Sequence, residues 1–286
     1  MIYKKFADTD LKISVLGFGT AGIGLSNYLR PDYNSVAIKK GSLQALEKAL
    51  ELGINFFDTA PAYANKTPNA VWPTDRMAER LLGEVIPTVK RSEIFIATKN
   101  MIGKYNPEDV RRSLHESLNV LNTDYIDLFQ IHGANYRESG YREMVSEELI
   151  EVLLDFKRQG LVRYLGISGY REGGLMPAID SGIFQAIMPQ YNIFYRGAEW
   201  ELLPLAKKKN IAVMPMRPLT AEEIVKFIKE IDCENILGIN PYFEAMKYVL
   251  KNDAVTSIPV GMRTAKEVGE NVQMIEQLKG VISGTI

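Results

Sequence analysis

The chain of 286 residues is poor in the side chains that form disulfides and bind metals: it has one cysteine, Cys233, and two histidines, His115 and His132. A single cysteine cannot form an intramolecular disulfide, and this scarcity is typical of proteins from a reducing compartment. So few cysteine and histidine side chains exclude a zinc cluster of the usual kind, and we expect no metal. Any catalysis here must rely on few histidines.

The sequence also lacks long apolar segments and an excess of charge of either sign. No run of about 18 apolar residues occurs, which excludes a transmembrane helix. The charged start MIYKKF is not followed by the apolar stretch of a signal peptide. Lys and Arg number 34 against 35 Asp and Glu, so we expect neither nucleic acid nor membrane as a partner. These features together predict a cytoplasmic protein that acts on a small molecule.

The residues that are present suffice for a large folded core. Hydrophobic residues make up 46% of the chain, which excludes disorder as the main state. No low-complexity stretch and no linker rich in Pro, Gly and Ser divides the sequence. We therefore predict that residues 1–286 form a single domain.

Short apolar runs alternate with amphipathic segments along the chain. Eight such runs are rich in β-branched and aromatic residues, as expected for parallel strands that are buried on both faces: 14–19, 54–60, 93–99, 125–132, 162–168, 184–192, 211–216 and 254–259. The segments between or after them show helical periodicity: 42–52, 106–121, 146–160, 200–210, 221–231, 241–252 and 264–278.

This alternation predicts an α/β fold, a (β/α)8 TIM barrel, in which functional side chains gather at the C-terminal ends of the strands. Residues 4–13 precede the first run and have the turn residues of a β-hairpin. We therefore expect an N-terminal β-hairpin in front of the barrel.

Gly17, Gly19 and Gly22 form a G-x-G-x-x-G motif directly after the first predicted strand. In a Rossmann fold this motif opens a long helix, and an acidic residue follows about 20 positions later. Here Gly24 and Pro31 interrupt the following segment, and positions 38–40 read IKK. We favour the interpretation that these glycines let the first barrel loop approach a bound ligand.

Polar residues end three consecutive predicted strands. Asp58 ends the second, Lys99 the third and His132 the fourth, and Tyr63 follows Asp58 by five residues. Neighbouring strands lie about 4.8 Å apart, so the four side chains can meet at one mouth. Asp58 can pair with Lys99, whose ammonium then stabilises a tyrosinate, while His132 can orient a carbonyl oxygen.

Each of the four residues also has an ordinary structural interpretation. A strand-end Asp often caps a helix, a Lys is often a surface charge, a Tyr often packs a loop, and a lone His is often buried in the core. Their coincidence at one end of three adjacent strands favours a catalytic site.

The residues around these four resemble the aldo-keto reductase family over nearly the whole chain. The resemblance is carried by FFDTAPAY (56–63), ATK (97–99), DLFQIH (127–132), GLVRYLGIS (160–168), PQYN (189–192) and VGMRTAKEVGEN (260–271). It implies a barrel that binds NADP(H) or NAD(H) without a Rossmann domain. It also implies that Tyr63 donates a proton to the substrate carbonyl, that Lys99 and Asp58 tune Tyr63, and that His132 positions the carbonyl.

The same resemblance implies a set of cofactor-binding residues. Ser168 and Gln190 match positions that bind the nicotinamide carboxamide, and Met216 and Arg217 match the region that stacks on the nicotinamide and meets the diphosphate. Further expected contacts lie at the first strand end and in the last strand–helix loop: Gly19, Thr20, Gly261, Arg263, Glu267 and Asn271.

Three positions depart from the family pattern: Gly169, Met216 and Glu267. Gly169 stands where the family usually has Asn, so one carboxamide contact is lost, and Met216 replaces an aromatic stacker with a polarizable thioether. Arg263 can bind a 2′-phosphate, whereas Glu267 would repel it. The sequence therefore predicts NADP as the cofactor, with NAD as the alternative. The ordinary interpretation of Arg263 is a surface charge without a specific role.

Two loops that follow the second and fourth predicted strands are candidates for the walls of a substrate pocket. Residues 64–75 contain Trp72, and residues 133–145 contain Tyr136 and Tyr141. Trp72 and Tyr136 are the predicted substrate contacts, although surface packing would explain them equally well.

Two further functions remain open alongside a carbonyl reductase or alcohol dehydrogenase. A non-catalytic regulatory or sensor subunit would bind the nicotinamide nucleotide without turnover. A lyase or aldolase would use Lys99 as a Schiff base, but Asp58 beside it favours the protonated amine.

Overall fold

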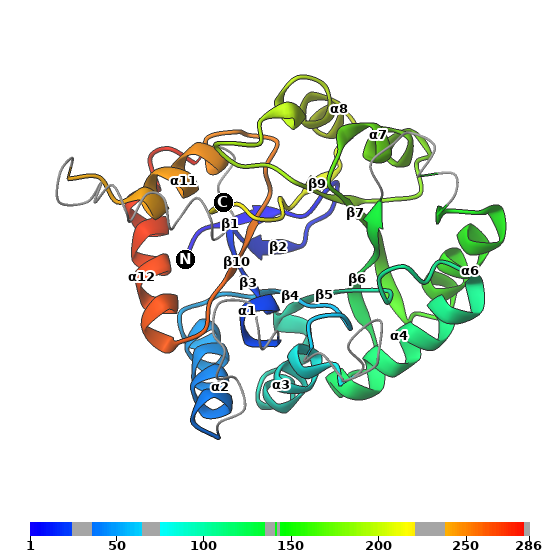
Figure 1. Ribbon diagram of the computed structural model, residues 1–286, viewed down its shortest axis with the longest axis horizontal. Coiled ribbons are helices and arrows are strands. Elements are labelled where there is room, and N and C mark those ends of the chain that lie inside the picture. Colours follow the sequence, from blue (N-terminus) through cyan, green and yellow to red (C-terminus); the bar gives the residue numbers. More distant parts are fainter. Residues whose placement is uncertain (25–35, 65–74, 135–140, 142–143, 221–237, 283–286) are drawn as a thin grey trace.

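Eight parallel strands form one curled sheet in the centre of the protein (Figure 1). A computed structural model describes residues 1–24, 36–64, 75–134, 141, 144–220 and 238–282. The strand order is β10-β3-β4-β5-β6-β7-β8-β9. The strands are β3 (Leu16–Gly19), β4 (Phe56–Asp58), β5 (Phe95–Lys99), β6 (Ile126–Ala134), β7 (Val162–Gly169), β8 (Ala186–Pro189), β9 (Ala212–Val213) and β10 (Ile258–Gly261). Each of the eight predicted runs overlaps one of these strands, and β6, β7 and β10 extend beyond the C-terminal ends of their runs.

The two ends of the sheet meet beside Val213, the last residue of β9. Val213 forms a parallel bridge with Val255, and the Thr256 amide donates to the Val213 carbonyl oxygen at 2.8 Å. Three residues after Val255, β10 begins and pairs with β3. The predicted (β/α)8 barrel is therefore confirmed.

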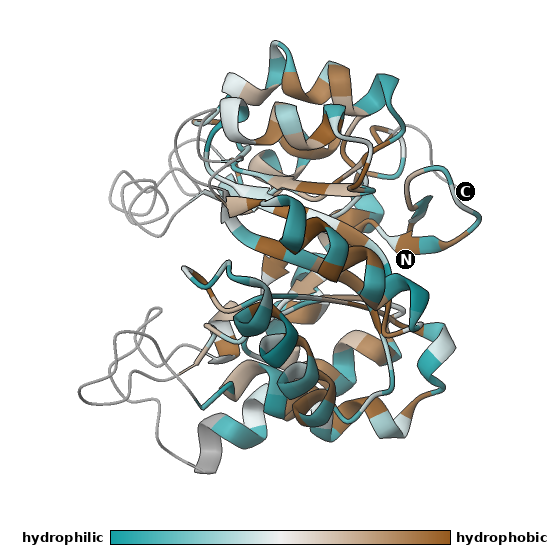
Figure 2. Cartoon of the chain, turned by 90° about the vertical axis from the view of Figure 1, so that its right-hand side faces the viewer, coloured by the Kyte–Doolittle hydropathy of each residue, from teal (hydrophilic) through white to brown (hydrophobic). Residues whose placement is uncertain are grey.

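Helices surround the strands (Figure 1). They are α1 (Ala21–Gly24), α2 (Val36–Glu51), α3 (Met77–Val85), α4 (Pro107–Leu121), α6 (Glu147–Arg158), α7 (Glu172–Asp180), α8 (Leu202–Lys208), α11 (Pro241–Leu250) and α12 (Ala265–Gln277), with short 3₁₀ turns η1 (Ile86–Thr88), η2 (Arg91–Glu93) and η3 (Gly197–Glu199). Brown, apolar residues run through the middle of the molecule in Figure 2, and the helices also carry teal, polar residues. In the described parts of the chain, no helix is both long and apolar enough to cross a membrane.

Capping residues set the ends of several helices. The side chains of Asn106, Ser146, Asn240 and Thr264 accept backbone N–H groups at the starts of α4, α6, α11 and α12. Helix α2 begins at Val36, six residues before the predicted start at 42, and residues 36–41 continue the helix without a break into the predicted segment. The helix predicted over 221–231 lies outside the described residues.

The N-terminal β-hairpin closes one end of the barrel. Strands β1 (Tyr3–Lys5) and β2 (Lys12–Ser14) pair antiparallel, as predicted, and they lie across the middle of the ring of strands in Figure 1. Phe6 and Ile13 are fully buried in the cluster that fills the barrel interior. The Lys4 Nζ donates to the Val255 carbonyl oxygen at 2.8 Å. This bond connects the hairpin to the place where the two ends of the sheet meet.

Alternate residues of each strand face the barrel interior, because side chains of a strand point to opposite faces in turn. Phe56 belongs to the inner cluster and Phe57 to the outer one, and on β5 Phe95 and Ala97 are inner while Ile96 is outer. The same alternation places Asp58 and Lys99 on the inner face, one layer nearer the C-terminal ends. The interior therefore changes from an apolar floor to a polar mouth.

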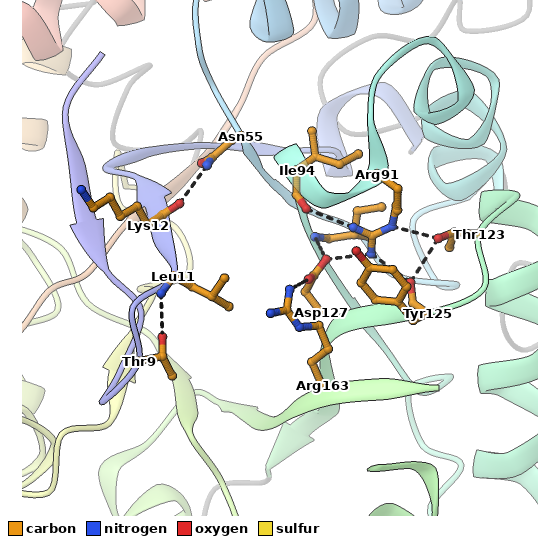
Figure 3. A network of polar contacts seen from close by, with 11 residues as sticks. Thr9, Leu11, Lys12, Asn55, Arg91, Ile94, Thr123, Tyr125, Asp127 and Arg163 are labelled. Carbon is orange, nitrogen blue, oxygen red and sulfur yellow. Dashed lines mark hydrogen bonds and ion pairs between the residues drawn. The ribbon is translucent and has the colours of Figure 1, made fainter. Parts of the chain in front are cut away.

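A buried carboxylate braces the strands at the floor end of the barrel (Figure 3). Asp127, near the start of β6, binds the guanidinium groups of Arg91 at 2.7 Å and Arg163 at 2.9 Å. Its Oδ2 also accepts the Ile96 backbone N–H of β5 at 2.9 Å. Arg91 lies 4.0 Å from the ring centroid of Tyr125. One side chain thus connects β5, β6 and β7.

We predict that Asp127→Asn lowers the free energy of unfolding by about 2–3 kcal/mol, because two arginines lose the charge that holds them together. Urea unfolding followed by circular dichroism measures this change. Asp124→Asn is the matched control, since Asp124 is exposed in the bend before β6, three residues earlier in the chain, and should change stability by less than about 0.5 kcal/mol. Equal unfolding midpoints for the two variants would contradict the role of Asp127.

Candidate active site

The four polar residues predicted at the strand ends lie together at the mouth of the barrel. Asp58 is the last residue of β4, Lys99 the last of β5, and His132 lies near the end of β6. Tyr63 comes from the loop after β4. Register brings them side by side, because β4 pairs with β5 and β5 pairs with β6.

Asp58 and Lys99 form a buried ion pair. The Lys99 Nζ donates to Asp58 Oδ1 at 2.7 Å and to the Thr59 carbonyl oxygen at 2.9 Å. Lys99 is 1% exposed and Asp58 is 4% exposed. Burial raises the pKa of Asp58 against the lowering effect of Lys99. Burial alone would lower the pKa of Lys99, but the charges and hydrogen bonds of Asp58 and Tyr63 together raise it. Lys99 is therefore held as the ammonium.

Tyr63 lies between this ammonium and His132. Its side chain hydrogen-bonds Lys99, whose Nζ is 4.9 Å from the centroid of the Tyr63 ring. The Tyr63 and His132 rings meet edge to face, with centroids 6.1 Å apart and planes at 89°. The phenol thus contacts a cation on one side and an imidazole on the other.

The backbone of Tyr63 is held on both sides. Its N–H donates to the Ala60 carbonyl oxygen at 3.0 Å, and its own carbonyl oxygen accepts the Ala78 N–H at 3.0 Å. Gly24, the last residue of α1, packs so closely that a Cβ there would lie 2.2 Å from the Tyr63 carbonyl oxygen. Only glycine permits this approach. The segment after the G-x-G-x-x-G motif therefore supports the tyrosine loop.

His132 is neutral and firmly placed. Its backbone N–H donates to Asn100 Oδ1 at 2.7 Å, and its carbonyl oxygen accepts the Tyr105 hydroxyl at 2.9 Å. Burial and the nearby charge of Lys99 lower the pKa of the imidazole to about 3. The ring Nδ1 is buried and finds no hydrogen-bond partner among the described residues.

The outer face of β5 is braced by a second buried charge pair. The Thr98 hydroxyl donates to Glu79 Oε1 at 2.7 Å, and Glu79, fully buried on α3, also binds the Arg76 guanidinium at 2.7 Å. Arg76 reaches Ser117 of α4 at 2.9 Å. This network fixes Thr98, the residue before Lys99, from the outer face of the barrel.

The first group of predicted cofactor residues lies on neighbouring strands. Gly19 pairs in register with Gly261, and the Thr20 hydroxyl donates to the Asp58 carbonyl oxygen at 3.0 Å. Ser168 is buried on β7, where its Oγ accepts the Gly133 N–H at 2.9 Å and donates to the Ile131 carbonyl oxygen at 3.3 Å. Ser168 thus also ties β6 to β7.

A second group continues round the mouth after β8 and β9. Gln190 forms a parallel bridge with Met216, and both residues are half-buried. Arg217 is exposed, has a positive φ of 54° and lies 5.7 Å from the Tyr170 ring centroid. Its strained backbone is held by Asn192, whose Nδ2 donates to the Arg217 carbonyl oxygen at 2.9 Å.

The third group lies at the start of α12. The Thr264 hydroxyl accepts the Glu267 N–H at 3.2 Å, and Glu267 Oε2 accepts the Arg263 N–H at 2.7 Å. Glu267 Oε1 also lies 3.6 Å from the Arg263 Nη2. The two side chains remain about one-third exposed, and Asn271 is buried one turn further along. The arginine and the glutamate that the sequence places in opposition are therefore paired.

These groups fit a dinucleotide as a set. An exposed arginine, a second partly exposed arginine and a helix N-terminus supply positive charge for phosphates, and Gly19 and Gly261 leave two paired strand ends without side chains. The half-buried Met216, after β9, offers a polarizable surface at the same end of the barrel.

Other predictions at the mouth differ in outcome. Trp72 and Tyr136 lie outside the described residues. Tyr141, expected in a wall of the mouth, instead packs in the core with its ring centroid 6.4 Å from that of Phe184. The prediction for Tyr141 was wrong because burying an aromatic ring stabilises the fold more than leaving it exposed at the mouth.

Sequence reasoning missed Gln130 and Asn100, which touch Asp58 and His132 respectively. A signal for Gln130 exists: it stands two residues before His132, on the same face of the strand. Within the described residues the glycine motif enters a helix of one turn, α1, and the barrel topology excludes its Rossmann interpretation.

Comparisons with known proteins agree with this geometry. A family model described as "Aldo/keto reductase family" matches residues 15–230. L-galactose dehydrogenase of Arabidopsis thaliana is 27% identical over 97% of this chain and 89% of its own length. NADH-specific methylglyoxal reductase of Escherichia coli is 26% identical over 92% of this chain and 90% of its own.

Solved structures share the fold. Aldo-keto reductase AKR11C1 from Bacillus halodurans, in its holo form, superposes with a TM-score of 0.75 at 25% identity. The match covers 96% of this chain and 91% of that one.

We predict that the imidazole of His132 stays neutral between pH 8 and pH 5, because its pKa in the folded protein is about 3 rather than 6.5. Below pH 6.5 the unfolded chain takes up this proton and the folded one does not, so the residue costs stability as the pH falls toward 3. Proton NMR of the ring resonances tests this. The chain has only two histidines, and His115→Gln leaves His132 as the single signal. A His132 shift that titrates within this range would contradict the prediction.

Proposed function

Because the chain belongs to the aldo/keto reductase family, we propose that it is a nicotinamide-dependent oxidoreductase. It reduces the carbonyl group of an aldehyde, ketone or sugar to an alcohol, or catalyses the reverse reaction. The sugar dehydrogenase and the methylglyoxal reductase among its relatives support a small carbonyl compound or alcohol as the substrate. That residues 1–286 act as one domain, in the cytoplasm, remains a prediction from the sequence.

One observation carries this proposal: a buried ammonium lies between a carboxylate and a phenol at the mouth of the barrel. A buried lysine charge is expensive unless it is paired. Here Asp58 balances the charge of Lys99, and the ammonium still contacts the phenol of Tyr63. That arrangement suits a phenol that must give up and regain a proton.

We assign Tyr63 as the general acid and base of the reaction. During reduction its hydroxyl donates a proton to the substrate oxygen, and the Lys99 ammonium stabilises the phenolate that remains. Asp58 keeps Lys99 in place. His132, neutral and edge-on to Tyr63, hydrogen-bonds the same oxygen and orients the carbonyl. When bound, the nicotinamide cofactor supplies or accepts the hydride.

The cofactor residues are proposed from the resemblance to the family, and their positions around the mouth support the assignment. Gln190 and Ser168 are proposed to bind the carboxamide, Met216 to cover the nicotinamide ring, and Arg217 to bind the diphosphate, with Gly19, Thr20 and Gly261 beside it. Arg263, Glu267 and Asn271 are proposed for the adenosine end. Trp72 and Tyr136 remain the predicted substrate contacts.

We propose NADP(H) as the cofactor, bound through Arg263, with NAD(H) as its competitor. Glu267 already engages both the backbone and the guanidinium of Arg263. Its negative charge opposes a 2′-phosphate and so weakens the preference for NADPH.

A regulatory subunit is the second function to be tested. Such a protein would bind the nucleotide and turn over no substrate, and it would have no use for a phenol paired with Lys99. A Schiff-base lyase is disfavoured by the same pair, because a protonated lysine is not a nucleophile.

We predict that Tyr63→Phe lowers kcat for carbonyl reduction by at least about 100-fold, since it removes the proton donor. NADPH binding, followed by its fluorescence, should be unchanged. The measurement is NADPH oxidation with a panel of aldehydes, ketones and sugars.

Tyr164→Phe is the matched control, because Tyr164 packs at the floor of the barrel against Phe6 and Phe95. It should keep wild-type activity. Nucleotide binding without turnover of any substrate in the wild type would favour the regulatory subunit instead.

We predict that Glu267→Gln raises the affinity for NADPH about tenfold, because one negative charge near the 2′-phosphate is lost. The affinity for NADH should change little. Fluorescence titrations with both nucleotides measure the ratio. Glu270→Gln, on the same helix and paired with Lys266, is the control. An unchanged NADPH to NADH ratio would remove Arg263 and Glu267 from the adenosine site.

A further inference from the structure

Gln130 contacts the buried Asp58–Lys99 ion pair from β6, the strand beside β5. It lies on the inner face of β6, two residues before His132, and is fully buried. Its Nε2 donates to Asp58 Oδ1 at 3.3 Å. The same oxygen accepts the Lys99 Nζ at 2.7 Å. An amide from β6 and an ammonium from β5 therefore converge on one atom of β4.

The barrel interior leaves room for this side chain. Gly166 of β7 faces Gln130 in register, and a Cβ on Gly166 would lie 3.0 Å from the Gln130 Cγ. A glycine in a buried strand contributes no side-chain packing and weakens the strand. The same Cβ would lie 3.0 Å from Leu128 Cδ1 and 3.2 Å from the Ala186 carbonyl oxygen. Glycine at position 166 therefore leaves space that both Gln130 and Leu128 occupy.

The amide is kept despite an incomplete set of hydrogen bonds. Gln130 Oε1 is buried and has no partner among the described residues, and an unpaired buried acceptor costs stability. A methionine of similar length would avoid that cost among the apolar neighbours below it. The bond from Nε2 to Asp58 is the interaction that the glutamine adds.

Asp58 needs such a donor because its surroundings oppose its charge. Burial raises its pKa, while Lys99 and Gln130 lower it. The other groups that face the pair are Tyr63, which contacts Lys99, and His132, which carries no charge. Within the described chain, the amide is thus the second group that favours the carboxylate.

We infer that Gln130 is a positioning residue of this site: its amide holds the Asp58 carboxylate ionised and turned toward Lys99, which keeps the ammonium beside Tyr63. The effect on catalysis rests on the proposed function, whereas the effect on Asp58 does not. Without the amide, Asp58 takes up a proton at a higher pH, and Lys99 loses its anchor.

The first test reads the protonation of Asp58 directly. Infrared absorption of the protonated carboxyl group is followed against pH, with Asp58→Asn as the blank. In Gln130→Met the midpoint should rise by about half a pH unit or more, because one donor to the carboxylate is lost. Gln130→Glu should raise it further, because a second carboxyl group then shares the site.

Gln185→Met is the matched control. Gln185 stands at the floor end, just before β8, where its side chain bonds the Leu165 N–H and the Ile183 carbonyl oxygen. This variant loses hydrogen bonds and stability but should leave the Asp58 midpoint unchanged. A midpoint in Gln130→Met equal to that of the wild type would overturn the inference.

The second test follows kcat against pH for a carbonyl substrate. The acid limb in the Gln130 variants should move upward by the same amount as the infrared midpoint, which a general loss of stability would not produce. An infrared shift in a protein that reduces no carbonyl would sink the proposed function and leave the role of Gln130 intact. Carbonyl reduction with an acid limb that does not shift in the Gln130 variants would support the proposed function and overturn the role of Gln130.

Discussion

The ion pair between Asp58 and Lys99 is the constraint around which the barrel mouth is organised. Removing two charges from water is costly, and close contact repays the cost only when the remaining donors and acceptors also find partners. Lys99 meets this requirement through Asp58, the Thr59 carbonyl oxygen and Tyr63. Such geometry tolerates little movement, so the ends of β4, β5 and β6 must keep their register.

The two ends of the barrel divide stability from chemistry. At the floor, Asp127 joins three strands through two arginines and a backbone N–H, and Phe6 and Ile13 of the hairpin seal the interior. At the mouth, the strand ends carry the buried charge of Lys99 and the left-handed backbone of Arg217, both among the residues proposed to act on the ligands. Rigid support at one end allows costly groups at the other.

Neighbouring loops hold each other in place around the mouth. Gly24 supports the backbone of Tyr63, and Asn192 holds the carbonyl oxygen of Arg217. Each contact joins segments that follow different strands. The position of each proposed binding residue therefore depends on the loop beside it as well as on its own strand.

The sequence by itself located the eight strands, the hairpin and the helices α4, α6, α11 and α12, which begin at capping residues, because apolar runs and capping residues act locally. It did not predict the helices α1, α3 and α7. Strand ends and the two-residue alternation of a strand also located Asp58, Lys99 and His132 on one rim. Tertiary structure alone decided which groups touch them. Gln130 meets Asp58 across 72 residues of chain, Gly24 meets Tyr63, and Tyr141 turns into the core. These contacts arise when the barrel closes, and nothing in the local pattern of residues encodes the distance between strands far apart in sequence.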